Sequence, residues 1–351
     1  VYVHTALTIS KRTMFAGLNG EKSGATVRPR LFLKSGTNAD GITITTTGSL
    51  YAERIDFWGN KAGQSAASNV ITLTEQSGAY VGANSLFFTD CIIRNGYTNG
   101  INCNKNRNGG LLDNCFILEN DEIGFNLLGL DWYCVTTQFG LSGGNNLYTD
   151  FGASNDFVCC DFYFSGKNAS YGGNKSNIYV GANVNTLTIS ACQINNGYHH
   201  GIECAESIAG GQYVFTSNQF GANGVATANT YSNIKMGFAR AAIKGNIHWN
   251  VGQKPKYLIE TSGTAVRVDF DDVYPTDAYV TAVTNDETKL FNRSARDGIV
   301  LGDAGTFISR TSTNDKRLKF FLNTDANEKF SIDNNGAMRW GAGGASATDT
   351  S

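Results

Sequence analysis

The sequence contains little proline and little charge. Proline accounts for 3 of the 351 residues, charged residues make up 17%, and the formal net charge is −2. So small a net charge gives no long-range attraction for nucleic acid or for an anionic membrane surface, and we expect neither as a partner. No apolar run approaches the ~18 residues of a transmembrane helix. The composition therefore favours a protein that recognises its partner through local contacts.

Targeting and metal-binding patterns are also lacking. The chain begins VYVHTALTIS, with neither an initiator methionine nor a basic segment followed by an apolar stretch, so we expect a piece of a longer protein. Its eight cysteines include no paired CxxC spacing, and we expect no metal and no cofactor. A chain of this length buries a large core without disulfides. Reduced, buried thiols are therefore the favoured interpretation, with isolated disulfides as the alternative.

Glycine is abundant, at 41 residues, and asparagine, threonine and serine recur between short apolar stretches. This composition is typical of many short strands joined by tight turns, with few helices.

The short strands follow a repeating template. In SLFFTDCII (85–93), residues 86, 88, 91 and 93 are expected to point inward, and the three-residue step marks a bend between two strands. Seven more sets of four positions fit this template: Leu50, Ala52, Ile55, Phe57; Gly110, Leu112, Cys115, Ile117; Cys134, Thr136, Phe139, Leu141; Phe157, Cys159, Phe162, Phe164; Leu187, Ile189, Cys192, Ile194; Tyr213, Phe215, Asn218, Phe220; and Ala241, Ile243, Asn246, His248.

The spacing of these sets indicates a solenoid. Their third members lie at 55, 91, 115, 139, 162, 192, 218 and 246, so most steps are close to 24 residues, with longer insertions between some sets. A third strand follows each set, with inward pairs such as Ile101 and Cys103 or Ile202 and Cys204. Three strands per coil with turns of variable length predict a parallel β-solenoid.

The outward residues between the first two inward positions form an apolar stripe. They are Tyr51, Phe87, Leu111, Val135, Val158, Thr188 and Val214, with Ile92 and Phe116 just beyond the bend. An exposed apolar stripe along a column marks association, and a lateral homotrimer satisfies it most simply. The alternative is that loops of the same chain cover the stripe.

The outward residues of the third strands are polar and aromatic. One residue from each successive coil is expected in a vertical file: Thr72, Asn102, Asn126, Tyr148, Tyr179, Glu203 and Lys235. Aromatic rings stack on the apolar faces of pyranoses, while amides and carboxylates bind hydroxyls, so the file suits an extended sugar chain. The alternative is a solvated face with incidental tyrosines.

The stretch NNGYHHGIEC (195–204) carries the most reactive groups of this face. Cys192 and Cys204 are assigned to the interior, which leaves His199, His200 and Glu203 outside. Two long turns, 165–177 and 221–233, bracket this coil and are expected to wall a groove over it. We assign Glu203 as a catalytic acid whose pKa burial raises, and Asp150, two coils earlier, as the base that activates water.

Further polar residues complete the predicted site. Glu206, Asp156 and Glu122 are expected to bind substrate with the residues of the file. The cluster Glu119, Asp121 and Glu122 is a second catalytic candidate, for which solvated turn residues are the alternative. His199 and His200 position substrate, or act as base in an elimination; as turn residues, both also fit plain surface histidines.

The coils from about 46 to 288 and the tail from 298 to 351 resemble capsule-degrading bacteriophage tailspikes, such as those of phages that attack encapsulated Acinetobacter. The segments FISRT, LKFFL and KFSI and the ending RWGAGGASATDT are similar to the small C-terminal β-domain of such spikes. The resemblance implies a single-stranded right-handed parallel β-helix of the pectate-lyase type. Its expected parts are an entry segment or cap (1–45), the β-helix with the polysaccharide site (46–288) and a C-terminal trimerisation domain (289–351).

The resemblance also implies a function. Such proteins are homotrimeric parts of the virion tail, joined to it by an N-terminal segment that this sequence lacks, and they bind and usually cut a bacterial capsule or O-antigen. Endo-acting glycoside hydrolysis is the expected activity. A polysaccharide lyase on the same fold and a non-catalytic receptor-binding spike are the alternatives.

Overall fold

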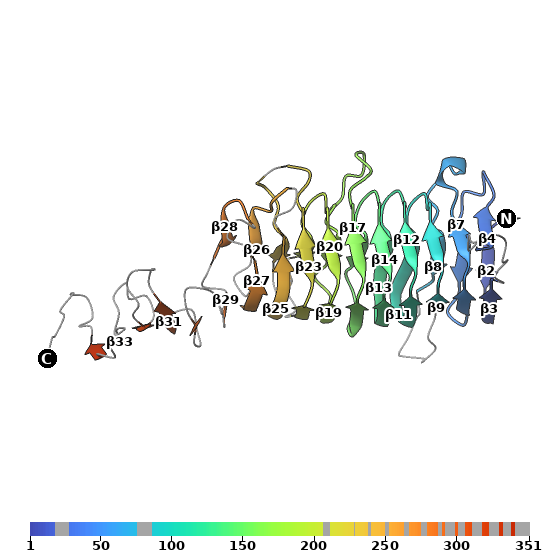
Figure 1. Ribbon diagram of the computed structural model, residues 1–351. Coiled ribbons are helices and arrows are strands. Elements are labelled where there is room, and N and C mark those ends of the chain that lie inside the picture. Colours follow the sequence, from blue (N-terminus) through green and yellow to red (C-terminus); the bar gives the residue numbers. More distant parts are fainter. Residues whose placement is uncertain are drawn as a thin grey trace, which may run out of the picture.

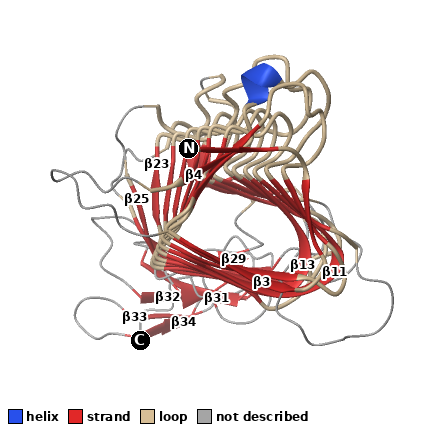
Figure 2. Ribbon diagram, turned by 90° about the vertical axis from the view of Figure 1, so that its right-hand side faces the viewer, coloured by secondary structure: helices blue, strands red, loops and turns tan. Residues whose placement is uncertain are grey.

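The computed structural model describes most of the first 286 residues and several short strands beyond them. The described ranges are 1–17, 28–75, 86–205, 211–227, 229–237, 240–249, 253–262, 267–274, 279–286, 290–291, 299–300, 306–310, 318–322, 330–332 and 338–340. In Figure 1 the strands up to β29 (Leu290–Phe291) stand side by side in one long column. Figure 2, which looks along this column, shows three sheets around a common interior, with the short 3-10 helix η1 (Lys61–Gly63) at one corner.

Each coil contributes one strand to each of three parallel sheets. Sheet one contains β3 (Arg12–Ala16), β6 (Ser49–Glu53), β9 (Leu86–Thr89), the ends of β11 (Ile101–Asp113) and β13 (Phe125–Val135), β16 (Asn155–Val158), β19 (Thr186–Ser190), β22 (Gln212–Thr216), β25 (Arg240–His248), β27 (Arg267–Val273) and β29 (Leu290–Phe291).

Sheet two follows the bend. It contains β1 (Tyr2–His4), β4 (Arg30–Leu33), β7 (Asp56–Trp58), β10 (Ile92–Arg94), β12 (Phe116–Leu118), β14 (Gln138–Gly140), β17 (Asp161–Tyr163), β20 (Gln193–Asn195), β23 (Gln219–Gly221) and the end of β25.

Sheet three closes each coil. It contains β2 (Leu7–Ile9), β5 (Ile42–Ile44), β8 (Ile71–Leu73), the starts of β11 and β13, β15 (Leu147–Thr149), β18 (Ile178–Val180), β21 (Ile202–Cys204), β24 (Ile234–Met236), β26 (Tyr257–Thr261) and β28 (Ala282–Thr284). The expected parallel β-helix is therefore confirmed.

The pairing corrects the register of two of the eight predicted sets. Leu112 pairs with Cys134, and Cys134 with Phe157, so the two sets are Trp132, Cys134, Thr137, Phe139 and Asn155, Phe157, Cys160, Phe162. The prediction placed both sets two residues too late. Within one strand a slip of two residues keeps each side chain on the same face, so Cys134, Phe139, Phe157 and Phe162 remain inward, and hydrophobic alternation alone does not exclude the slip.

The slip also changes several assignments made from the sequence, and Thr136, Leu141 and Phe164, expected inside, are not buried. Cys159, expected inside, is exposed, and its neighbour Cys160 is buried. The outward file of sheet one runs Met14, Tyr51, Phe87, Leu111, Tyr133, Asp156, Thr188, Val214, so Val135 and Val158 lie in the next file and Asp156 interrupts the apolar stripe.

A recurring backbone kink marks the true register. The residue before each third inward position has a left-handed conformation, with φ between 47° and 66°: Arg54, Asp90, Asn114, Thr136, Cys159, Ala191, Ser217 and Gly245. Left-handed backbone is costly for most L-residues, so its recurrence at one phase shows that the sharp bend is built into every coil.

The interior side chain after most of these kinks, though not Ile55, satisfies backbone that the bend exposes. The amide of Cys192 donates to Asn218 Oδ1 at 2.9 Å, and the amide of Asn218 donates to Asn246 Oδ1 at 2.8 Å. Asn218 Nδ2 in turn donates to the carbonyl of Ile189 at 2.9 Å. Because an unpaired buried amide costs ~1–3 kcal/mol, this position needs Cys, Thr, Asn or Asp in most coils. All eight cysteines are free thiols, as the sequence favoured, and seven of them are buried.

Replacing Thr137 by valine tests this bend ladder. Thr137 Oγ1 accepts from the Cys115 amide at 3.3 Å and donates to the carbonyls of Leu112 and Val135 at 3.1 and 3.0 Å, with the residue fully buried. Since valine keeps the shape but forms none of these bonds, we expect a loss of ~1–3 kcal/mol in the free energy of unfolding, measured by denaturant titration. Thr188→Val, on the outer face of sheet one, is the control. Equal stability of the two variants would contradict the ladder.

Apolar stacks fill the rest of the interior. The inward file of sheet two runs Phe57, Ile93, Ile117, Phe139, Phe162, Ile194, Phe220 and His248, and the rings of Phe139 and Phe162 stack at 4.8 Å. At the far end, the fully buried His248 places Nε2 2.9 Å from Asp272 Oδ2. The column is thus held by vertical contacts between residues some 22–36 positions apart.

The first coils and the last strands bear on the predicted boundaries. Within 1–45, expected as an entry segment, the described strands of residues 2–16 and 30–44 already pair in register with the next coil. At the other end, the described strands β30 (Ile299–Val300), β31 (Thr306–Arg310), β32 (Leu318–Leu322), β33 (Phe330–Ile332) and β34 (Met338–Trp340) form an antiparallel sheet. The RWGAGGASATDT ending lies outside the described residues from position 341 onward.

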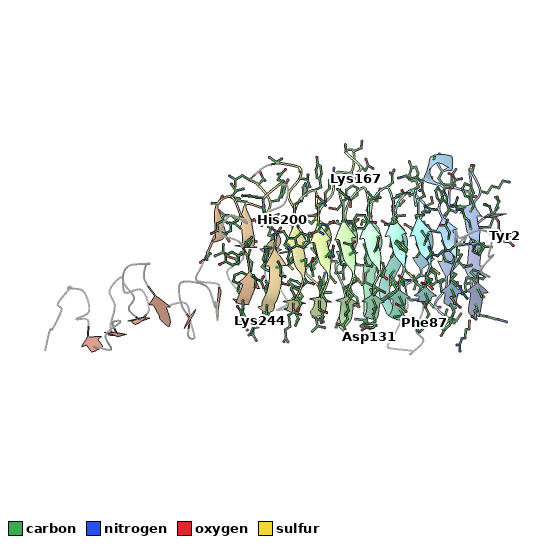
Figure 3. All side chains as sticks on the ribbon, viewed as in Figure 1. Tyr2, Phe87, Asp131, Lys167, His200 and Lys244 are labelled. Carbon is green, nitrogen blue, oxygen red and sulfur yellow. The ribbon has the colours of Figure 1, made fainter. Side chains whose placement is uncertain are left out.

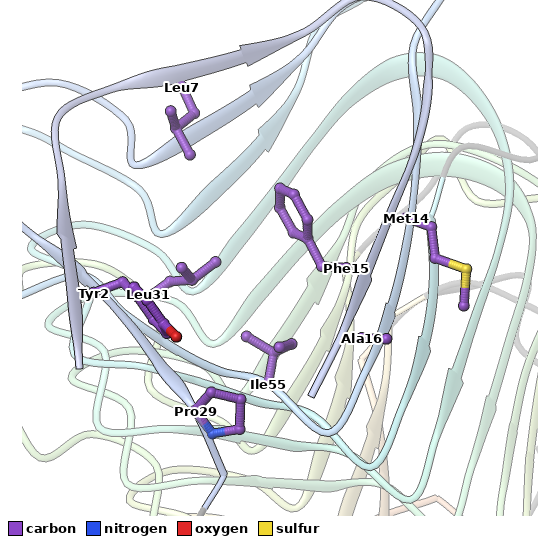
Figure 4. A pocket seen from close by; sticks show the side chains of 8 residues that line it. All are labelled: Tyr2, Leu7, Met14, Phe15, Ala16, Pro29, Leu31 and Ile55. Carbon is purple, nitrogen blue, oxygen red and sulfur yellow. The ribbon is translucent and has the colours of Figure 1, made fainter. Parts of the chain in front are cut away.

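An apolar cavity of about 550 Å³ opens at the first coil (Figure 4). It is lined by Tyr2, Leu7, Met14, Phe15, Ala16, Pro29, Leu31 and Ile55, and it holds none of the candidate carboxylates. No helix among the described residues is long and apolar enough to cross a membrane.

Candidate functional site

The polar file predicted on sheet three is present in the expected order. Register pairs join Thr72, Asn102, Asn126, Tyr148, Tyr179, Glu203 and Lys235 in turn, and the file continues to Glu260. We call this outer surface of β8 to β26 the ribbon. Asn126 Nδ2 donates to Asn102 Oδ1 at 2.7 Å, which ties two rungs together. Because the side chains alternate along each short strand, one outward residue per coil is enough to build the ribbon.

Two tyrosines form the aromatic part of the ribbon. The rings of Tyr148 and Tyr179 stack with centroids 5.2 Å apart and an interplanar angle of 10°. Burial raises the pKa of Tyr148 to about 12, and the nearby carboxylate of Asp150 adds to the shift. The hydroxyl therefore remains a hydrogen-bond donor at any physiological pH.

Glu203 is the best-anchored acid of the ribbon. Its Oε2 accepts hydrogen bonds from the Asn174 amide and, at 2.9 Å, from Ser176 Oγ. Its Oε1 lies 3.1 Å from Lys235 Nζ, and the carboxyl-bearing side chain is 13% exposed. Strand β21 and the turn before β18 thus hold one carboxylate in a fixed orientation.

The electrostatics of Glu203 differ from the expectation. Burial acts to raise the pKa of its carboxyl, but the His200 ring in its protonated form, the Asn174 amide and the Lys235 ammonium outweigh burial, and the pKa lies below its ordinary value. The predicted raised pKa is therefore wrong. The reason is that hydrogen bonds and cations favour the charged form more than partial desolvation disfavours it.

The two histidines of the turn before β21 have different roles. His200 is buried, and its Nδ1 accepts from the Ser232 amide at 2.9 Å, so it is not a surface histidine. His199 is half-buried, accepts from the Lys175 amide at Nδ1 (3.3 Å) and stacks on Tyr231 at 4.4 Å. With Nδ1 occupied as an acceptor, the neutral ring carries its proton on Nε2, so each histidine offers a donor and no free basic nitrogen.

Burial lowers the pKa of both rings, that of His200 to about 4, so the pair is uncharged at neutral pH. Figure 3 shows His200 and Lys167 on the same, upper side of the column.

Asp150 follows β15 directly. Its Oδ1 accepts from the amide and the side chain of Asn183, both at 3.3 Å. A Cβ atom on Gly181 would lie 2.0 Å from Asp150 Oδ1, so the carboxylate lies against this glycine and leans toward the coil of Tyr179. Only glycine at 181 leaves room for that position.

The long turns extend the polar surface beyond the ribbon. Tyr171, in the 165–177 turn, packs across Gly144 and Gly173, and its pKa is raised by burial and by Glu122. Burial, together with Asp121, likewise raises the pKa of Glu122. The 221–233 turn places Tyr231 on His199. Described residues of both turns therefore contact the coil of Glu203 or its neighbours, and the groove expected between the turns 165–177 and 221–233 stays a prediction.

Not every predicted site residue joins this surface. Lys235, Asn102 and Asn126 lie in the ribbon, and Glu122 lies one turn away, beside Tyr171. Asp156 is on sheet one, in register between Tyr133 and Thr188, which separates it from Glu203. Glu206 lies outside the described residues. Of the second acidic cluster, Glu119 accepts from Asn95 Nδ2 at 3.0 Å and Asp121 pairs with Lys61 at 3.3 Å.

The sequence reading missed the residues that hold the carboxylates. Ser176 donates to Glu203. Ser232 occupies the same position two coils later and donates to Glu260 at 2.7 Å. The signal was a Ser-Asn pair directly before the third strand, as in SNIYV and SNIKM. Among the described residues no three His, Cys, Asp or Glu side chains converge to hold a metal ion.

No protein-family model matches the sequence, and no curated protein matches it. Solved structures share its fold. The enzymatically active domain of tailspike protein 2 from bacteriophage CBA120 superposes with a TM-score of 0.59 at 16% identity, covering 90% of this chain and 55% of that one. The ORF18 protein of Geobacillus virus E2 gives a TM-score of 0.55 at 12% identity, covering 99% and 65%. The chain thus has the β-helix fold of these phage proteins and spans little more than half of the tailspike domain.

Proposed function

We propose that this protein is the polysaccharide-binding and polysaccharide-cutting part of a phage tailspike, which acts outside the cell on a bacterial capsule or O-antigen. The observation that carries the proposal is the ribbon, where an anchored carboxylate, Glu203, adjoins a tyrosine pair on a rigid face. Sugar sites combine aromatic surface with a few convergent polar groups in this way. The tailspike fold supports the biological setting.

Hydrolysis is the reaction that the geometry favours. Asp150 and Glu203 belong to third strands two coils apart, so their backbones are roughly 10 Å apart along the column. A retaining pair needs its carboxyl groups ~5–5.5 Å apart, whereas an inverting pair leaves ~6.5–9.5 Å for the attacking water, so the wide spacing favours inversion. We therefore infer an endo-acting, inverting hydrolase.

The roles of the two carboxyl groups are exchanged relative to the sequence-based assignment. Glu203, whose pKa is lowered, is ionised at neutral pH and is suited to activate water as general base. Asp150 takes the part of the acid that protonates the glycosidic oxygen. Tyr148 and Tyr179 hold the sugar rings, and His199 donates from Nε2 to a substrate hydroxyl.

A lyase is the second candidate, and Lys235 is the observation in its favour, since an ammonium beside the ribbon can neutralise a uronate. However, Lys235 Nζ already pairs with Glu203. In both histidines Nδ1 already accepts a hydrogen bond, so neither imidazole has a basic nitrogen available to abstract the proton in an elimination. The Acinetobacter host suggested by the resemblance stays a prediction.

Incubation with a panel of purified capsular polysaccharides tests the proposal. We expect one polysaccharide to shorten on size-exclusion chromatography and to gain reducing ends without the ultraviolet absorbance of an unsaturated uronic product. That absorbance would show a lyase instead. Retention on a polysaccharide without shortening would show a receptor-binding spike.

We also propose that the chain assembles as a homotrimer through the N-terminal half of the sheet-one stripe. Met14 and Tyr133 are 68% and 46% exposed, and the rings of Tyr51 and Phe87 stack at 4.6 Å between them. Such a row of apolar side chains on a rigid face requires a cover.

Leu111→Lys is expected to convert the trimer to monomer, because it buries a charge in the centre of this stripe. The measurement is light scattering after size exclusion. Thr188→Lys, in the same file beyond Asp156, is the matched control and should leave the trimer intact. A trimer that tolerates Leu111→Lys would place the interface elsewhere.

A further inference from the structure

The aromatic ring of Tyr163, outside the ribbon, has a geometry that packing alone does not require. Tyr163, on β17 of sheet two, points outward and is in register with Gly140 on β14. A Cβ atom on Gly140 would lie 2.6 Å from Tyr163 Cζ and 2.7 and 2.9 Å from its two Cε atoms. Nearly equal distances to the two Cε atoms mean that the ring lies face down on the glycine. Its opposite face therefore points away from the sheet.

Polar side chains surround this ring. The Tyr163 hydroxyl donates to Gln138 Oε1 at 3.4 Å. Asp161 is in register with Gln138 and Gln193 on the neighbouring strands, and burial raises the pKa of its half-buried carboxyl. Asn195 adjoins Tyr163 in the same outward file. We call Tyr163, Gln138, Asp161, Gln193 and Asn195 the Tyr163 platform.

The edge of the platform is also aromatic. Phe164 is 40% exposed and stands almost perpendicular to Tyr163, at 82° with centroids 6.0 Å apart. Lys167 Nζ lies 4.6 Å from the Phe164 ring centroid. The flat Tyr163 ring, bounded by the upright Phe164 ring and by side-chain amides, forms a shallow binding surface for one small, flat, hydroxylated group.

We propose that the Tyr163 platform is a second carbohydrate-binding site, separate from the ribbon, which takes a pyranose with its axial C–H groups on the tyrosine ring. The amides of Gln138, Gln193 and Asn195 and the carboxyl of Asp161 bind the ring hydroxyls. This chemistry fits a neutral sugar, because the platform offers the carboxyl group of Asp161, while the ammonium of Lys167 lies over Phe164. A protein partner would need a wider continuous apolar patch than one ring.

The two sites lie on adjacent faces of one rigid column. Tyr163 and Tyr179 belong to the second and third strands of the same coil, separated by the 165–177 turn. A polysaccharide bound at the platform has a higher effective concentration at the ribbon. The protein therefore holds the polysaccharide longer, while the rate of the cleavage step does not change. The platform binds sugar whether or not the ribbon cleaves it.

Fluorine NMR of protein labelled with 3-fluorotyrosine tests the proposal. Chitohexaose is the probe, because each of its rings presents axial C–H groups on both faces. The Tyr163 resonance, assigned by its loss in Tyr163→Phe, is expected to shift in a saturable way, while the resonance of Tyr133 on sheet one stays constant. A Tyr163 resonance that does not move would overturn the proposal, whatever Tyr148 and Tyr179 do. Shifts of those two alone would support the ribbon and refute the platform.

A matched variant distinguishes a role of Tyr163 in sugar binding from a role in packing over Gly140 alone. Tyr163→Leu keeps an apolar side chain over Gly140 but lacks the flat ring. We expect its affinity for immobilised chitohexaose to fall about tenfold, which corresponds to ~1.4 kcal/mol, with an unchanged melting temperature. An unchanged affinity would assign Tyr163 to packing only.

Discussion

Replacing Glu203 by glutamine is expected to reduce the rate of polysaccharide cleavage by roughly 10²–10⁴-fold, the usual range for loss of a general acid or base. Glutamine keeps an oxygen that accepts from Ser176 and preserves the size of the side chain, but it cannot take a proton from water. The loss should therefore appear in kcat, with little change in KM, because the tyrosine pair still binds the chain. The measurement is the release of reducing ends under saturating substrate.

The chain contains a matched control for this change. Glu260 lies in the same file, and Ser232 donates to it as Ser176 donates to Glu203, but its register partner on β24 is Lys235 rather than a tyrosine. Glu260→Gln should leave the rate nearly unchanged. Full activity of Glu203→Gln, with a melting temperature like that of the native protein, would remove Glu203 from the mechanism.

Acid is expected to destabilise the fold through His200. Burial lowers the pKa of its imidazole from 6.5 to about 4, although the carboxylates of Glu203 and Glu260 oppose the shift and Lys235 adds to it. The unfolded chain binds the proton near pH 6.5 and the folded chain only near pH 4, so the stability contribution is present above pH 6.5 and is lost as the pH falls toward 4. At 1.36 kcal/mol per pKa unit, the loss is about 3 kcal/mol.

Thermal or denaturant unfolding at several pH values measures this effect. Between pH 7 and pH 4, His200→Gln should lose less stability than the native chain, because the side chain that resists protonation is gone. His4→Gln, near the first strand, should follow the native curve. Identical pH dependence of the native chain and His200→Gln would contradict the buried, neutral state of this imidazole.

Much of the fold follows from the sequence because each coil repeats one pattern. Six of the eight four-residue sets were placed correctly, and the third-strand file from Thr72 to Lys235 was correct at every rung, since inward pairs such as Ile178 and Val180 leave one outward residue between them. The two misplaced sets begin with Trp132 and Asn155, and neither residue is a small or aliphatic side chain of the kind expected at an inward position. The correct register of these two sets is shown by the left-handed backbone at Thr136 and Cys159. The sequence does not reveal this conformation, because neither threonine nor cysteine favours it.

The site was less predictable than the fold. The position of Glu203 beside Tyr179 follows from the repeat, but its charge state depends in part on Asn174 and Lys235, which come from two other coils. A pKa is the balance of burial against such neighbours, and their distances cannot be obtained from spacing alone. The same limit applies to Asp150, whose direction is decided by the absence of a side chain at Gly181.

A crystal structure of the Glu203→Gln protein with an oligosaccharide from the polysaccharide that the native protein shortens tests the central claim most directly. We predict sugar rings along the ribbon, in contact with Tyr148 and Tyr179, with one glycosidic oxygen between residue 203 and Asp150. An oligosaccharide bound on another face of the column, with the ribbon empty, would contradict the account.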